Sequence, residues 1–194
     1  AYVRRSASDY VVRVITNIGV TKPSFWLGII LILTFYKLAP GFASIGYVPF
    51  RDDPLGNLSR MILPTVSLAL PILASLSRIM RSAMLDALGQ DYVRTARAKG
   101  VSETAVIFRH ALRNALIPFV TAVGITAGNL FGGAIVVEQV FALPGLGRLV
   151  ICAFAERNYP MIQATILLVT SGFVVINFLV DMLYVAIDPR VREA

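Results

Sequence analysis

Residues Asp91 to Pro118 read DYVRTARAKGVSETAVIFRHALRNALIP, a polar and basic stretch between two long apolar segments. From Arg78 to Arg113 the sequence holds seven of its 18 lysines and arginines, against three acidic residues. Basic loops of membrane proteins stay on the cytoplasmic side of the bilayer. The stretch is therefore predicted to be a cytoplasmic loop held between membrane helices, and it is a candidate docking surface for a cytoplasmic partner.

The composition of the whole chain favours an all-α, polytopic membrane protein. Apolar residues make up 57% of the 194 residues and charged residues 15%, whereas a soluble domain carries about a quarter charged residues. The net charge of +7 is assigned to topology and lipid headgroups, not to nucleic acid, because the basic residues lie beside apolar spans without an interleaved aromatic platform. With a single cysteine, Cys152, and a single histidine, His110, the sequence predicts no disulfide, no metal cluster and no cofactor.

Four segments are apolar enough to be expected to cross a hydrocarbon core of about 30 Å, which takes roughly 20 helical residues. They run from Ser24 to Leu38, from about Arg60 to Ser77 or further, from Asn114 to Val137, and from Met161 to Val180. The first is short unless residues 10–20 extend it through a kink. We expect one membrane domain, residues 1–194, a helical bundle of about four spans. Alternation places the loop 89–114 and the C-terminus on the cytoplasmic side.

Within the loop, two short helices joined at a glycine are predicted to form a bent hairpin, residues 91–113. Asp91 is expected to cap the first helix, and Gly100 to stop it in the left-handed conformation. Ser102 is expected to cap the second helix, with Glu103 in its first turn. The apolar face of this second helix is predicted from helical spacing, as Ile107, Ala111, Leu112 and Ala115.

The hairpin also carries the expected docking residues. Ala96 and Gly100 lack bulk, so the backbone of a partner is expected to approach there, while Arg94, Arg97 and Arg109 offer guanidinium groups to its carboxylates. The full predicted set is Asp91, Tyr92, Arg94, Thr95, Ala96, Arg97, Lys99, Gly100, Arg109, His110 and Arg113. From spacing alone, a basic helical loop without a docking role is an equally good interpretation.

The residues of this loop resemble a known family. DYVRTARAKG followed by RHALRNALIP is similar to the cytoplasmic loop of permease subunits from binding-protein-dependent ATP-binding-cassette importers. Three further blocks resemble the B-type permease of the dipeptide and oligopeptide branch: GGAIVVEQVFALPGLGRL (132–149), RNYPMIQA (157–164) and NFLVDMLYVAIDPRVR (177–192). Arg94, Thr95 and Ala96 stand where the wider superfamily has Glu-Ala-Ala, a variation that resembles the peptide branch.

The resemblance implies a type I importer permease in the cytoplasmic membrane of a bacterium or archaeon, with the hairpin inserted in a cleft of the ATPase. It implies four partners: P-loop ATPase subunits, a second related permease subunit, an extracytoplasmic substrate-binding protein and the lipid bilayer. Short peptides are the expected cargo, with nickel, glutathione, oligosaccharides and siderophore-like compounds left open. The resemblance also implies an N-terminal truncation, since relatives carry a first helix and an external segment before the position of Ala1.

The remaining candidate residues lie outside the hairpin. Gly124, Gly128, Gly132 and Gly133 form a bare stripe of the third span, predicted to serve helix packing or to line the translocation path. Glu138 lies in the block that the resemblance places near the external gate and is a candidate to line the path. Asp181 is expected to form a structural ion pair with a neighbouring helix or with Arg190. A short amphipathic helix is predicted over residues 146–154.

No GxxxxGK[ST] motif occurs, so ATP hydrolysis is expected on a partner subunit and no catalytic residue in this chain. An ion-coupled transporter acting alone would place ionisable residues at mid-span, and the third span has none. An intramembrane enzyme would need a nucleophile with its base, or a metal, inside the bilayer. The single cysteine and histidine both lie outside the predicted spans.

Overall fold

The computed structural model describes residues 23–39 and 45–187, and all regular structure in them is helical. In chain order the elements are α2 (Ser24–Leu38), α3 (Pro54–Leu88), α4 (Asp91–Ala98), α5 (Glu103–Ala105), the π-helix η1 (Val106–Ala111), α6 (Leu112–Val140), α7 (Leu146–Ala155) and α8 (Tyr159–Ile187). The all-α membrane fold is confirmed.

Three of the expected spans are long helices in the described residues. Within residues 23–39 and 45–187, the helices long and apolar enough to cross a membrane are Pro54–Leu88, the continuous helical stretch Glu103–Leu130, and Tyr159–Leu183. The fourth expected span, α2, has 15 residues and is about 22 Å long, which is shorter than the hydrocarbon core. Its expected extension through residues 10–20 lies outside the described residues.

Helix α3 is much longer than the span expected from its apolar run. Asp53 caps it by accepting a hydrogen bond from the Gly56 amide at 2.9 Å, and Pro54 occupies the first turn, where the absence of an N–H is harmless. The helix continues for 35 residues through Pro64 and Pro71, a length of about 52 Å. Helix α3 is therefore long enough to cross a membrane and to reach the start of the hairpin.

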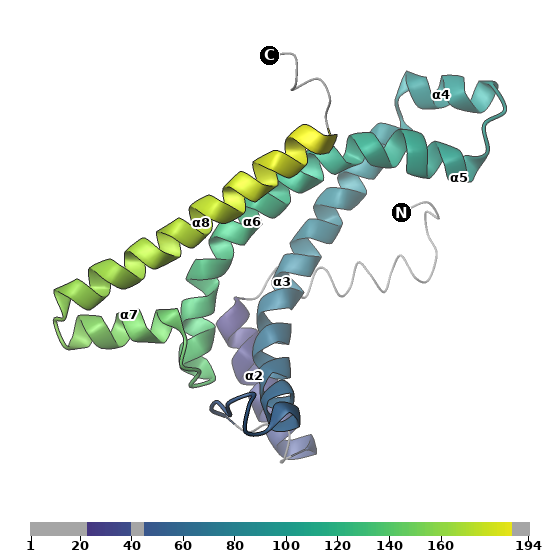
Figure 1. Ribbon diagram of the computed structural model, residues 1–194. Coiled ribbons are helices and arrows are strands. Elements are labelled where there is room, and N and C mark those ends of the chain that lie inside the picture. Colours follow the sequence, from purple (N-terminus) through teal and green to yellow (C-terminus); the bar gives the residue numbers. More distant parts are fainter. Residues whose placement is uncertain (1–22, 40–44, 188–194) are drawn as a thin grey trace.

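Helix α6 is the centre of the bundle, since it contacts α2, α3, α7 and α8. Figure 1 shows α8 running alongside α6, with α7 folded back beneath them, while α3 and α2 lie on the other side of α6. Two apolar clusters join α3 to α6. One contains Leu63, Val137 and Phe141. The other lies near the hairpin and contains Ala87, Ala111 and Ala115, whose small side chains let the two helices approach closely.

Candidate functional site

The turn between the two arms of the hairpin is a Schellman motif. The Gly100 amide donates to the Arg97 carbonyl at 2.9 Å, and the Val101 amide donates to the Ala96 carbonyl at 3.2 Å. Gly100 has a φ of +76°, a left-handed conformation that glycine adopts without steric cost. The prediction that Gly100 ends the first helix in this way is confirmed.

Both predicted caps need correction. Gln90 takes the N-cap position of α4, so Asp91 is the first helical residue and caps nothing with its side chain. Its carboxylate still lies in the first turn, where the helix dipole favours negative charge. Ser102 does occupy the N-cap of the second arm, but its side chain makes no capping hydrogen bond. Its backbone carbonyl accepts from the Val106 amide at 3.0 Å instead.

The hairpin has its own small apolar interior. Val93 and Val106 are fully buried, and Ala96 is 8% exposed, with Leu88 and Val101 packed against the three. Ala96 thus faces the other arm of the hairpin, and its small size serves contact between the arms. The contact between Ala96 and the backbone of a partner stays a prediction. The inward position of Ala96 argues against that contact.

The second arm buries part of the face that regular helical spacing predicts: Ala111 and Ala115 are confirmed, and Val106 takes the place expected for Ile107. Val106, Ala111 and Ala115 are buried, at intervals of five and then four residues, whereas Ile107 and Leu112 are only partly buried. The interval of five arises because residues 106–111 form a π-helix, whose hydrogen bonds skip one residue more than in an α-helix. Such π segments are frequent at functional sites.

An ion pair fastens the two arms on either side of Gly100. Arg97 donates from Nε to Glu103 Oε1 at 2.7 Å and from Nη2 to Oε2 at 3.3 Å. The predicted free guanidinium of Arg97 is therefore engaged inside the hairpin. Arg94 makes only a long, exposed contact of 3.4 Å with Asp91.

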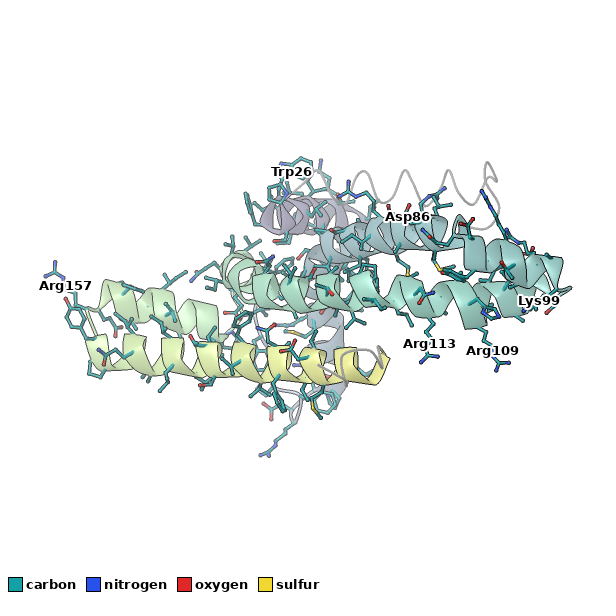
Figure 2. The ribbon with its side chains drawn as sticks, turned by 90° about the horizontal axis from the view of Figure 1, so that it is seen from above. Trp26, Asp86, Lys99, Arg109, Arg113 and Arg157 are labelled. Carbon is teal, nitrogen blue, oxygen red and sulfur yellow. The ribbon has the colours of Figure 1, made fainter. Side chains whose placement is uncertain are left out.

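The remaining basic residues are open on the surface. Figure 2 shows Arg109 and Arg113 projecting from the same side of their helix, with Lys99 at the end of the hairpin. Phe108, which the sequence analysis did not single out, is 65% exposed and directly precedes Arg109. Exposed aromatic residues beside arginines are enriched at protein interfaces. The sequence feature that could have identified Phe108 as a contact residue is its position as an isolated phenylalanine inside a basic loop.

The glycines of α6 do not act as one stripe. A Cβ atom at Gly124 would lie 2.9 Å from Cγ1 of Val180, and one at Gly128 would overlap the ring of Phe173, so α8 approaches the α6 backbone at both places. A Cβ at Gly133 would make only ordinary contacts, the nearest with Leu68 at 3.7 Å, and one at Gly132 would meet open space.

Glu138 has a structural task at the far end of α6. Its Oε2 accepts a hydrogen bond from the Arg148 amide at 3.0 Å, in the first turn of α7, where free amides favour an anion. The Glu138 carboxylate lies so close to Gly145 that a side chain there would overlap it, and Gly147 brings α7 against Ile135 of α6. The amphipathic helix predicted over residues 146–154 is observed as α7 (Leu146–Ala155).

Comparison with known proteins gives consistent results. The family described as binding-protein-dependent transport system inner membrane component matches residues 1–193. A putative peptide transport system permease protein of Brucella abortus (strain 2308) is 50% identical over 192 residues, which are 99% of this chain and 61% of the relative.

Two further relatives come from other bacteria. A probable peptide ABC transporter permease protein of Sinorhizobium fredii is 41% identical over 184 residues, 95% of this chain and 59% of the relative. A glutathione transport system permease protein of Escherichia coli (strain K12) is 45% identical over 174 residues, 90% of this chain and 54% of the relative. The chain therefore spans between about half and three fifths of the length of these relatives.

Proposed function

This chain belongs to the family of binding-protein-dependent transport system inner membrane components, and from that membership we propose that it is the membrane-spanning part of a permease in an ATP-driven importer of short peptides. It works without a catalytic site of its own, because ATP is hydrolysed on a partner subunit. The second permease position is occupied by a related subunit, and an extracytoplasmic binding protein delivers the cargo.

The observation that carries the proposal is the construction of the hairpin. Its second arm continues without a break into α6, and its first arm is joined to α3 by the two residues Gly89 and Gln90. The arms are held to each other by the buried Val93 and Val106 and by the Arg97–Glu103 pair. A force applied to the hairpin is therefore transmitted to two long membrane helices together.

For this to drive transport, the ATPase must bind the hairpin differently in its open and closed states, since a partner with equal affinity for both conformations shifts nothing. The exposed surface of Phe108, Arg109 and Arg113 supports such a contact, as it combines an aromatic residue with two guanidinium groups. In this proposal the hairpin and the C-terminus face the cytoplasm, in agreement with the excess of basic residues there.

The cargo is proposed from the relatives. Those from Brucella abortus and Sinorhizobium fredii carry peptide transport in their names, and the one from Escherichia coli carries glutathione transport. We place short peptides first because the relative with 50% identity is a peptide permease by name. Glutathione is the second candidate, supported by the 45% identity of the other relative.

Replacing Gly100 tests the coupling role. A Cβ at Gly100 would meet nothing within 4 Å, so Gly100→Val introduces no clash and acts only through backbone strain at a positive φ, of about 1 to 2 kcal/mol. In the assembled importer in proteoliposomes, this variant is expected to insert normally and to hydrolyse ATP with little peptide uptake per ATP. Gly100→Asn is the matched control, because asparagine tolerates the left-handed conformation. Uptake per ATP equal to that of the wild type in Gly100→Val would refute the coupling role.

A further inference from the structure

A groove of about 820 Å³ lies between α6 and α8. Its volume is within the range of small-molecule sites, about 300 to 1,000 Å³. Apolar walls are provided by Ile125, Val169, Phe173 and Val180. The groove thus has the size and the apolar walls of a ligand site.

Polar side chains from both helices also line this groove. On α6, Thr121 and Asn129 are eight residues apart, two helical turns on the same face. On α8, Thr170, Asn177 and Asp181 follow at intervals of seven and four residues, which also places them on one face. Polar residues in apolar helices therefore gather on the two faces that border the groove.

Thr121 donates to the Ile117 carbonyl at 3.2 Å, whereas the other four polar groups are without partners inside the described part of the chain. No described residue forms a hydrogen bond or ion pair with the side chains of Asn129, Thr170, Asn177 or Asp181. Of the two partners expected for Asp181, no neighbouring helix supplies one among the described residues, and Arg190 lies outside them. The Asp181 carboxylate is exposed on the groove. Ionisable residues in transmembrane helices are rare and mark candidate functional sites.

The chemistry of this lining selects its ligand. Asp181 can only accept hydrogen bonds when ionised, so it calls for a cationic donor. The amides of Asn129 and Asn177 each offer donors and an acceptor, which match the N–H and C=O of a peptide bond. A short peptide carries a protonated amino terminus, peptide bonds and side chains that fit against apolar walls.

We propose that the α6–α8 groove binds a short peptide through its protonated amino terminus, with Asp181 accepting from the ammonium and Asn129 and Asn177 pairing with peptide groups. This assignment rests on the proposed transport function and adds the place where the permease itself holds the cargo. A covering helix is the competing occupant, and it would close the groove to water and leave the carboxylate without a cation.

Thiol labelling in the assembled importer distinguishes these occupants without any transport measurement. In a Cys152→Ser background, Asn177→Cys, one turn from Asp181 on α8, is expected to react with a cationic methanethiosulfonate at least tenfold faster than with an anionic one. Asp181→Asn removes this preference, and Asp181→Glu keeps it. Val174→Cys is the matched control, because Val174 lies one turn from Asn177 but does not line the groove. Equal, slow labelling of Asn177→Cys and Val174→Cys would overturn the proposal.

Peptide uptake into proteoliposomes provides the second test. At saturating binding protein, Asp181→Asn is expected to lower the uptake of a radiolabelled dipeptide by tenfold or more, while ATP hydrolysis stimulated by the binding protein persists. Wild-type uptake in Asp181→Asn overturns the groove assignment and leaves the importer function standing. No uptake by the wild-type protein refutes the proposed function instead, and the charge preference in labelling then still decides whether the groove attracts cations.

Discussion

The hairpin and the α6–α8 pair are built in opposite ways. In the hairpin, Val93 and Val106 are fully buried, and Arg97 and Glu103 satisfy each other across the turn. In α8, the most apolar stretch of 18 residues has none of its residues buried, and Asn177 and Asp181 have no described partner. The difference is that the hairpin completes its own interior, whereas the exposed surface of α8 must be covered by lipid, cargo or another helix.

The largest effect is expected from breaking the interior of the hairpin. Val106→Asp places a carboxylate where the native side chain is 0% exposed, and burying an unpaired charge costs about 3 kcal/mol or more. Hydrogen exchange in residues 91–111 should rise steeply, while α8 keeps its protection. Thr104→Asp, at an exposed position of the same arm, is the control. Unchanged exchange in Val106→Asp would mean that the hairpin has no interior of its own.

An intermediate effect is expected where α8 touches α6. Gly128→Ala brings a methyl group against the ring of Phe173, and overpacking costs about 1 to 3 kcal/mol. Because Phe173 is 39% exposed, its ring has room to turn, so we expect the lower part of that range. The thermal stability of the purified protein in detergent measures this effect.

Two further variants make the test specific. Gly132→Ala faces open space and should leave the stability unchanged. Phe173→Ala should remove the cost of Gly128→Ala, since only the overlap couples the two positions. Equal losses at Gly128 and Gly132 would contradict the close approach of α8.

The smallest effect is expected at the Arg97–Glu103 pair. Its side chains are 40% and 45% exposed, so solvent screening limits its contribution to about 0.2 to 1 kcal/mol. Glu103→Gln should therefore change the stability little but widen the range of angles between the arms, measured as spin-label distances across Gly100. The double variant Arg97→Glu with Glu103→Arg restores a pair of opposite charge and should narrow the distances again. If neither change alters the distribution of spin-label distances, the angle between the arms is held by the packing of Val93 and Val106 alone.

The features of the hairpin that could be predicted from the sequence are those that depend on contacts within a few neighbouring residues. Gly100 follows a short helical run and precedes Val101, a pattern that specifies a left-handed stop through contacts within a few residues. The apolar runs located α3, α6 and α8 for the same reason, since a helix satisfies its own backbone. Helix α2 was predicted with its observed bounds, Ser24 to Leu38, and its short length was already evident from the number of residues in the apolar run.

The residues whose roles were missed all depend on a second element. Ala96 turned inward because Val106 lies opposite it, and Arg97 found Glu103 because the Schellman turn brings the arms together. The buried face of the second arm begins at Val106 and not at Ile107, because one π turn adds a residue to the helical repeat, which a period of 3.6 cannot anticipate. The partners of these groups lie at positions that no local pattern encodes.

The sequence by itself determined the all-α membrane class, the basic hairpin between spans and its left-handed glycine, because backbone hydrogen bonding, hydropathy and local sterics act over a few neighbouring residues. Only the tertiary structure decided that Glu138 caps α7 and that α8 packs against Gly124 and Gly128 of α6. It also decided that Asn129, Asn177 and Asp181 border one groove. Those contacts join residues 10 to 56 positions apart in the sequence. Their energies depend on distances that arise only after the helices have packed.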